Sequence, residues 1–327
     1  MEFRLSDDQL ELQHAVRKFC VETLPIGGVG ERTEGRGDRS SWRALADLGV
    51  FGLVVSVEKS GSGLGCLEAA VVFEQLGGHL VEGPVLWSTI TAPLLTGAED
   101  GSRVVAGLEL DLQSGDPVVV EHGSQADTIV VLCHGGAFSH ERADLPDPLP
   151  LNPLDPLTPV ARFGRFPGGS RIGDGETAQH LRLLGTVLSA AQLLGIAGQS
   201  LEVARDYALT REQFNVPIGS FQALKHLMAD MFVRVELARS ATYAAASVVD
   251  NPRVGDPDRA VRIAKLLSGE AALANSRAAV QILGGMGFTW AMPPHFFLKR
   301  SWVLESSFGT TEDHARALGA GLEHLVA

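Results

Sequence analysis

Two stretches of sequence decide how this chain folds: Arg211–Gln222 (REQFNVPIGSFQ) and Gln281–Thr289 (QILGGMGFT). In the first, an arginine and a glutamine lie eleven residues apart, on the two sides of a turn. A guanidinium and a glutamine amide placed in this way can hold a diphosphate and its ribose, with charge-assisted hydrogen bonds from the arginine. Taken alone, Arg211 can also be interpreted as a side chain that neutralises the C-terminus of a helix.

The second stretch contains a glycine pair, Gly284 and Gly285, after a long helix-compatible segment. A pyrophosphate or an adenosine can approach backbone amides closely only where no Cβ intervenes, which requires glycine. A glycine pair also commonly ends a helix as its C-cap. The two interpretations are compatible, so the pair predicts both a helix end and a backbone surface open to an anion.

Both stretches resemble signatures of the acyl-CoA dehydrogenase superfamily, in the proper order and at the proper distance. The first is similar to the family's arginine–turn–glutamine motif and the second to its Gln-x-x-Gly-Gly-x-Gly motif. Residues 45–86 (LADLGVFGLVVSVEKSGSGLGCLEAAVVFEQLGGHLVEGPVL) have the family's order of helix, glycine loop and helix. The resemblance spans roughly residues 5–95 and 179–327.

The resemblance implies a mainly α fold with a small β middle domain. Its three parts are expected at residues 1–98 (an N-terminal helical domain), 99–178 (a shortened β middle domain) and 179–327 (a C-terminal four-helix bundle).

The N-terminal pattern agrees with helices. Ser6 is a candidate N-cap for a first amphipathic helix. The stretches Trp42–Val55 and Leu67–Leu76 are apolar and helix-compatible, and the glycine-rich loop Gly61–Gly65 separates them.

Between about residue 100 and residue 178 the pattern changes to short β-branched runs, Val118–Val120 and Thr128–Leu132. The segment Asp144–Pro159 contains six prolines, which cannot donate a regular ladder of hydrogen bonds. It is expected to be an edge strand or a loop.

Helices return after Thr177, and four are expected. They run to about Thr210, from Phe221 to about Val249, from Asp256-Pro257 to Gly284-Gly285, and onward from Thr310. Four such helices predict a bundle.

In the family, FAD lies at a subunit interface, and the arginine and Gln-x-x-Gly-Gly motifs reach across to the neighbouring subunit's flavin. The resemblance therefore implies an oxidoreductase that uses FAD shared at a subunit interface. The cofactor-binding residues that it implies are Arg211, Gln213, Phe214, Gln222, Gln281, Gly284, Gly285, Gly309 and Thr310.

The chain departs from the family at its catalytic base. Family enzymes remove an α-proton with a carboxylate while the flavin accepts the β-hydride. Counted from Gln281, the family's Glu-Gly-Thr step falls on Phe308, Gly309 and Thr310. Counted back from Arg211, the alternative base position falls on Gly185. Neither Phe308 nor Gly185 can accept a proton. Glu305 is a weak candidate for a relocated base, since it is more simply a solvated charge or a partner for Arg300.

A second departure lies between Val104 and Val118, where the family loop that holds the flavin ring has no match. The half of the site that serves a neighbouring subunit is retained. The leading hypothesis is therefore a base-less subunit of a heteromeric (α2β2) acyl-CoA dehydrogenase, with a homologous full-length subunit as its partner. The resemblance associates such subunits with actinobacterial degradation of steroid side-chain CoA thioesters.

Two alternatives remain. The chain is either a self-sufficient dehydrogenase or same-fold flavin monooxygenase with a displaced or absent base, or a helical interaction module without flavin. The flavin content of the purified chain distinguishes them.

Composition excludes several other classes. A formal net charge of -12 argues against nucleic-acid binding, and 45% hydrophobic residues are typical of an ordered globular protein. Three scattered cysteines indicate neither a disulfide framework nor a zinc site, so a reducing cytoplasm is expected and no metal. No signal peptide is expected at the N-terminus, and no apolar run is expected to reach membrane-spanning length.

Overall fold

The computed structural model describes residues 4–33, 40–110, 117–164, 166 and 168–326. The chain divides into two compact units. The first comprises Met1–Arg36, Cys66–Val81 and Thr186–Ala327, and the second comprises Gly37–Gly65 and Glu82–Gly185.

The first unit contains the N-terminal helices α1 (Asp7–Thr23), α2 (Val29–Arg32) and α4 (Cys66–Gly78). The N-cap predicted at Ser6 is confirmed, because its side chain accepts the backbone N–H of Gln9 while the Gln9 side chain accepts the N–H of Ser6. Such a capping box satisfies two backbone donors that would otherwise have no partner.

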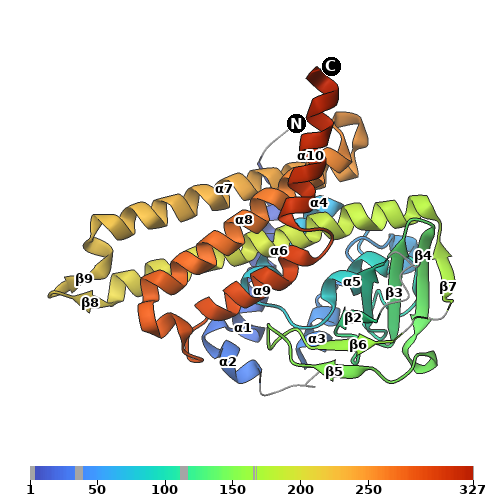
Figure 1. The fold of residues 1–327 in the computed structure, drawn as a ribbon, viewed down its shortest axis with the longest axis horizontal. Helices are drawn as coiled ribbons and strands as arrows, with labels where there is room; N and C mark the ends of the chain where they lie inside the picture. The colour runs from blue at the N-terminus through green and yellow to red at the C-terminus, as the bar shows by residue number, and fades with distance from the viewer. Residues whose placement is uncertain (1–3, 34–39, 111–116, 165, 167, 327) are drawn as a thin grey trace. The chain divides into compact units, whose positions relative to one another are not determined.

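Longer helices dominate the C-terminal part of the chain (Figure 1). Their bounds are α6 (Gly175–Thr210), α7 (Gln222–Asp250), α8 (Pro257–Leu283), α9 (Pro294–Ser306) and α10 (Thr311–Val326). The sequence predicted four of these helices near these positions. It left α9 unassigned, although Pro293 and Pro294 begin it as proline begins many helices.

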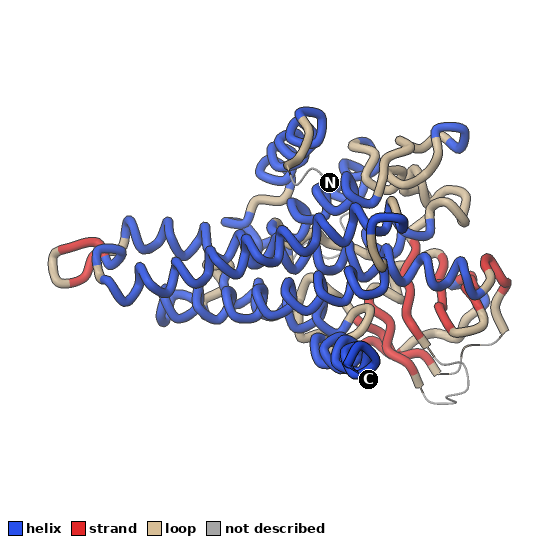
Figure 2. The backbone as a smooth tube through the Cα atoms, turned by 90° about the horizontal axis from the view of Figure 1, so that it is seen from above, coloured by secondary structure: helices blue, strands red, loops and turns tan. Residues whose placement is uncertain are grey.

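In the first unit, α7 and α8 lie side by side with the part of α6 that follows Thr186 (Figures 1 and 2). Apolar residues, three of them alanines, line the contact: Leu194 and Ala197 of α6 share one buried cluster with Val235 and Ala238 of α7 and Ala271 of α8. Alanine at these positions allows the helix axes to approach closely.

The second unit contains α3 (Ser40–Asp47), α5 (Val85–Thr91) and two sheets. One sheet has the order β1 (Val105–Glu109), β3 (Thr128–Cys133), β4 (Gly136–Glu141) and β7 (Ser170–Gly173). The other has the order β2 (Val118–Glu121), β6 (Val160–Phe163) and β5 (Leu149–Leu151).

Strand pairing in these sheets is antiparallel except between β1 and β3, which run parallel. All six residues of β3 are buried, as expected for a central strand. β5 is an edge strand within Asp144–Pro159, which agrees with the expectation for that proline-rich segment.

The helix predicted over Trp42–Val55 is wrong in its second half. Helix α3 ends at Asp47, and Gly49 has a φ of +81°. A positive φ cannot continue an α-helix, so the chain turns there. The aromatic rings of Trp42 and Phe51 pack on each other across this turn, with centroids 4.3 Å apart.

The expectation that no apolar run has membrane-spanning length is also wrong for α6. This helix is long and apolar enough by length and composition, with a mean hydropathy of 1.5 in its most apolar window. However, 83% of that window is buried inside the protein, which is typical of a core helix.

Candidate functional site

The turn between α6 and α7 carries the first sequence motif. The chain leaves α6 at Thr210 and forms a small hairpin from β8 (Glu212–Gln213) and β9 (Val216–Pro217). Phe214 and Asn215 between the strands have φ values of 55° and 63°. Two consecutive left-handed residues define a turn that matches the natural twist of a hairpin.

The side chains of this hairpin are directed to the surface. Arg211, Gln213 and Gln222 are exposed, and the Phe214 ring is 88% exposed. Arg211 is fixed through its backbone, since its carbonyl accepts the N–H of Ile218 at 2.8 Å. Its guanidinium makes no hydrogen bond or ion pair with the described part of the chain. The motif therefore presents a cation on a fixed backbone.

The second motif lies where α8 ends. Gly284 is the C-cap, with a φ of +59°, so the predicted helix end is confirmed. A Cβ built on Gly284 or on Gly285 would have no atom within 4 Å, whereas one on Gly287 would lie 2.9 Å from the carbonyl oxygen of Val280. Packing therefore requires Gly287 alone. The open space at the other two glycines fits the close approach of a phosphate or an adenosine to the backbone.

A shared buried cluster brings the two motifs together. Ile218, from the turn after the hairpin, packs in the same cluster as Ile282 and Leu283 at the end of α8. Gln281, the residue before Ile282, is exposed. The arginine turn and the glycine turn are thus held at one end of the helices by a common core.

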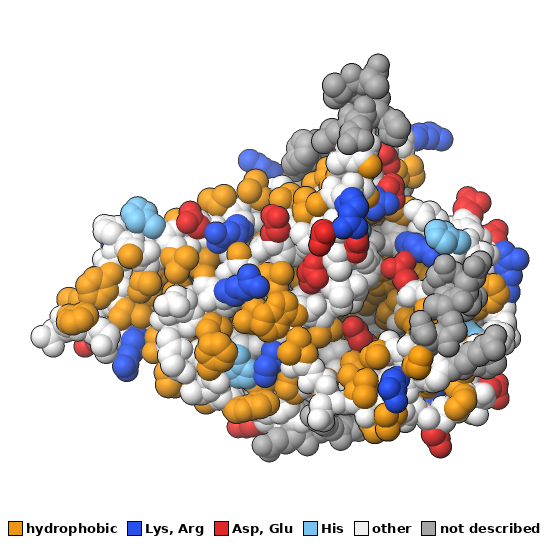
Figure 3. All heavy atoms as spheres, in the orientation of Figure 1, with side chains coloured by type: hydrophobic (Ala, Val, Ile, Leu, Met, Phe, Trp, Pro, Cys, Tyr) orange, Lys and Arg blue, Asp and Glu red, His pale blue; other side chains and the backbone are white. Residues whose placement is uncertain are grey.

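Exposed hydrophobic side chains surround these motifs. We call Phe214, Phe221, Met286 and Phe288 the tip surface; they are 88%, 39%, 44% and 68% exposed. Figure 3 shows hydrophobic side chains gathered at the end of the molecule that carries the hairpin. Phe232, Val233 and Leu237 add an exposed apolar stripe along α7. Large apolar patches of this kind mark interaction surfaces.

Phe308, the position predicted for the family's base, lies in a second turn, between α9 and α10. Phe308 is 7% exposed, with a φ of 56°, and Gly309 has a φ of +91°. Thr310 caps α10, since its hydroxyl accepts the N–H of Asp313 at 3.1 Å and the Asp313 carboxylate accepts the N–H of Thr310 at 3.1 Å. Phe308, Gly309 and Thr310 carry no carboxylate or imidazole that could accept a proton.

Glu305 has a structural partner in this turn. One of its carboxylate oxygens accepts the backbone N–H of Thr311 at 2.7 Å, which stabilises the beginning of α10. Gly185 lies buried within α6 and has no side chain to act as a base. The three candidate base positions therefore hold a phenyl ring, a helix-capping carboxylate and a glycine.

Lys265 is the residue of this region that the sequence analysis missed. It is fully buried on α8, and its ammonium donates to the carbonyl oxygen of Leu304 at 2.7 Å, to that of Ser307, and to the Ser189 hydroxyl at 3.2 Å. The available signal was a lysine between Val261 and Ser268 on the buried face of an amphipathic helix.

His314 holds the same turn from α10. Its Nε2 donates to the carbonyl oxygen of Phe308 at 2.9 Å. Burial lowers the pKa of His314, and the positive charge of Lys265 lowers it further. The imidazole is therefore neutral at neutral pH, and the Phe308 turn is fixed from two helices.

The loop that would hold a flavin ring in the family falls between Val104 and Val118. Residues 111–116 of that span lie outside the described residues. No metal site was expected anywhere in the chain. Within the part of the chain that the structure describes, no cluster of three or more His, Cys, Asp or Glu side chains could hold a metal ion.

The part of the chain that the structure describes is mainly helical with a small β region, and an exposed arginine and an open glycine turn lie near each other at the ends of its long helices. Residues 6–99 match the family described as acyl-CoA dehydrogenase, N-terminal domain, and residues 159–323 match the one described as acyl-CoA dehydrogenase, C-terminal domain. The chain belongs to the acyl-CoA dehydrogenase family, whose members are FAD-dependent oxidoreductases that act on acyl-CoA.

Relatives include the acyl-CoA dehydrogenase IpdE2 of Mycobacterium tuberculosis, 32% identical over 81% of this chain and 80% of the relative. FadE34 of the same organism is 30% identical over 81% of this chain and 40% of its own length. Among solved structures, the ChsE4-ChsE5 complex of M. tuberculosis has a chain that superimposes with a TM-score of 0.86 at 24% identity, covering 99% of both chains. That similarity confirms the predicted fold.

Proposed function

We propose that this chain is a non-catalytic subunit of a heteromeric acyl-CoA dehydrogenase. In this proposal it completes the FAD site of a homologous full-length partner within an α2β2 assembly, and the partner binds the acyl-CoA. FAD supplies the hydride acceptor for α,β-dehydrogenation when it is bound in the partner. The contribution of this chain is to bind and orient the cofactor.

The observation that carries the proposal is the composition of the Phe308 turn. A dehydrogenase needs a carboxylate against the α-carbon of its substrate. Here Phe308 and Gly185 stand at the base positions, and Glu305 is occupied with the N–H of Thr311. A chain with this turn requires a partner for the proton-transfer step.

The tip surface supports the second half of the proposal. Arg211 would bind the diphosphate of the partner's flavin, Gln213, Phe214 and Gln222 would border it, and the open backbone at Gly284 would admit the adenosine. The exposed Phe214 and Phe288 would be buried against the partner, because exposed aromatic side chains of this size favour association. Gln281, Gly285, Gly309 and Thr310 are proposed to belong to the same shared site.

A steroid side-chain CoA thioester is the proposed substrate class. One structural neighbour is described as a steroid ACAD, at 23% identity and a TM-score of 0.83.

A cytoplasmic location is proposed as well, supported by three free and buried cysteines. The three-part division at residues 1–98, 99–178 and 179–327 is part of the same proposal.

The flavin content of the purified protein tests this function. We expect the chain alone to bind FAD weakly or not at all, and its complex with a full-length homologue encoded nearby to contain two flavins per tetramer. Light scattering gives the mass and flavin absorbance gives the stoichiometry. Near-stoichiometric FAD on the chain alone would instead support the self-sufficient enzyme, and a complex without flavin would support the plain interaction module.

Phe308→Glu provides a further test, because it restores the residue type of the family's base. We expect the turnover of the complex to stay at the wild-type level, since the proposed flavin ring lies in the partner and no substrate reaches residue 308. The matched control is Phe308→Gln, which has the same shape without the charge. A rise in turnover for Phe308→Glu alone would show that this chain has its own active site.

A further inference from the structure

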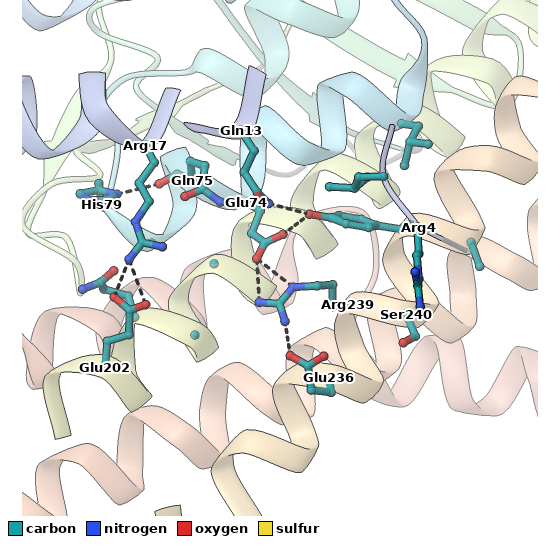
Figure 4. A pocket seen from close by; sticks show the side chains of 18 of the residues that line it. Arg4, Gln13, Arg17, Glu74, Gln75, His79, Glu202, Glu236, Arg239 and Ser240 are labelled. Carbon is teal, nitrogen blue, oxygen red and sulfur yellow. Dashed lines mark hydrogen bonds and ion pairs between the residues drawn. The ribbon is translucent and has the colours of Figure 1, made fainter. Parts of the chain in front are cut away.

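A pocket of about 490 Å³ lies within the first unit, between α1, α4, α6 and α7 (Figure 4). Its volume falls within the range of pockets that hold small molecules. Its lining includes no residue of the two sequence motifs and no residue of the Phe308 turn. The pocket is therefore separate from the proposed flavin site.

Glycines of α4 and α6 form the floor of the pocket. A Cβ on Gly195 would lie 1.9 Å from the carbonyl oxygen of Glu74, so the two helices touch backbone to backbone there. Gly198, nearly one turn further along α6, also lines the pocket, yet a Cβ on it would have no atom within 4 Å. Glycine inside a helix is destabilising relative to alanine. Packing explains Gly195 but not Gly198, where the missing side chain keeps the floor open.

At one end of the pocket the charged side chains are paired with one another. Glu74 is 6% exposed and accepts two hydrogen bonds from Arg239, at 3.0 and 3.2 Å, and one from the Tyr243 hydroxyl. Arg239 also pairs with Glu236. Figure 4 shows these side chains directed toward one another. This end is rigid and its charges are balanced.

The other end has cationic groups with hydrogen-bonding capacity to spare. Arg17 bonds both carboxylate oxygens of Glu202 through Nη2 alone, at 3.1 and 3.2 Å. His79 Nδ1 lies 2.9 Å from the carbonyl oxygen of Gln75, which places the proton of the neutral ring on Nδ1. Its Nε2 has no hydrogen bond to the residues that the structure describes.

Two arginines and one glutamate act electrostatically on His79 at this end. Burial lowers the pKa of His79 most, and the charges of Arg17 and Arg32 lower it further, against the opposing effects of the hydrogen bond to the Gln75 carbonyl and of the Glu202 charge. These are the charged groups around the imidazole on α1, α2 and α6, and α4 contributes Gln75. An anion here would be bound by Arg17 and would favour protonation of His79, which turns Nε2 into a donor.

We propose that this pocket is a binding site for a small polar metabolite with an oxyanion at one end. The oxyanion, a phosphate ester or a carboxylate, lies against Arg17 and His79. The rest of the molecule runs over the bare backbone of Gly198 toward Tyr243, where the pocket wall offers hydroxyl and amide groups.

Calorimetric titration of the full chain with sodium sulfate and with sodium acetate, against sodium chloride at equal ionic strength, tests the site. Sulfate stands for a phosphate ester and acetate for a carboxylate. We expect one of them to bind and chloride not to; preference for sulfate identifies a phosphate ester and preference for acetate a carboxylate. The absence of binding by both oxyanions would overturn the proposal.

Gly198→Leu fills the floor and is expected to abolish oxyanion binding without unfolding the chain. Gly319→Leu is the matched control, because Gly319 lies in helix α10 with nothing within 4 Å of its Cβ position and far from the pocket lining. Equal affinity in both variants and wild type would refute the site.

Charge variants locate the anion. Arg17→Met should weaken binding by about tenfold or more, as loss of a charge-assisted bond does, while Glu202→Gln should strengthen it by freeing Arg17. The sulfate affinity should rise as the pH falls through the pKa of His79 in the bound state, since sulfate itself does not titrate there. A pH-independent affinity, or no effect of Arg17→Met, would place the anion elsewhere and overturn the assignment.

Discussion

The chain has two comparable turns between helices, the hairpin at Phe214 and the turn at Phe308. Their backbone conformations are similar, but the first is exposed to solvent and the second is buried. Each contains consecutive residues with positive φ, Phe214 and Asn215 in one and Phe308 and Gly309 in the other. The Phe214 ring is 88% exposed, whereas Phe308 is 7% exposed and its turn is hydrogen-bonded from two helices. The difference teaches that the first turn leaves its aromatic side chain open to solvent, as the proposed contact with a partner requires, whereas the second is closed within the chain.

The largest effect is expected from breaking the closed turn. Lys265→Met removes the ammonium that donates to the carbonyl oxygens of Leu304 and Ser307, and leaves the buried Leu304 oxygen with only the Ser307 N–H at 3.3 Å. An unsatisfied buried polar group costs about 1–3 kcal/mol, so the free energy of unfolding should fall by about 3 kcal/mol. Urea denaturation followed by circular dichroism measures it.

Lys225→Met is the control for that change, because Lys225 is exposed on α7 and surface substitutions of this kind stay within about 0.5 kcal/mol. Equal stability of the Lys265→Met chain and the wild type would mean that the Phe308 turn is held by other contacts.

The next effect concerns the exposed turn. Arg211→Ala would remove the proposed charge-assisted contact to the flavin diphosphate, which is expected to contribute about 1.5–3 kcal/mol. The FAD affinity of the complex should therefore fall by roughly one to two powers of ten. Fluorescence titration of the apo-complex with FAD measures this, and turnover should decrease in parallel.

Arg205→Ala is the matched control, since Arg205 lies six residues earlier, on α6, is 55% exposed and pairs with its neighbour Asp206. It should leave FAD affinity unchanged. If Arg211→Ala leaves FAD affinity as unchanged as Arg205→Ala does, the exposed turn does not bind a flavin, and its exposure must have another cause.

The smallest effect is expected at Glu305. Glu305→Gln keeps an oxygen that accepts the Thr311 N–H while removing the capacity to accept a proton from a substrate. The turnover of the complex should remain within about twofold of the wild type, because a general base contributes at least about a hundredfold and Glu305 is not one. A hundredfold loss would identify Glu305 as a relocated base.

The sequence predicted best where local chemistry sets the structure. Asp256 and Pro257 at the start of α8 and Gly284 at its end act at the positions expected for an N-cap, a first-turn proline and a C-cap. The exposed turn at Arg211 was predicted from a motif of adjacent residues. Each of these signals depends on a few neighbouring side chains, so no tertiary information is needed to interpret them.

The prediction was weakest where contacts between residues far apart in the sequence determine the structure. The helix expected to continue to Val55 ends at Asp47 because the apolar residues that follow pack as a turn rather than as a helix face. Lys265 was missed because its partners, the carbonyl oxygens of Leu304 and Ser307, lie about forty residues away. The residues near Lys265 in the sequence show only that a charged side chain lies on an apolar helix face. The oxygen atoms that accept its hydrogen bonds are brought to it by the fold.

The edge strand β5 affects the tendency of the newly made chain to aggregate before assembly. Leu149 and Leu151 are 52% and 37% exposed at the border of a three-stranded sheet, which is the kind of edge that pairs with other chains and aggregates. Pro150 lies between them and Pro148 and Pro153 flank them, so this border has few donors for a foreign strand. The prolines act as gatekeepers that keep newly made chains from polymerising through their β unit.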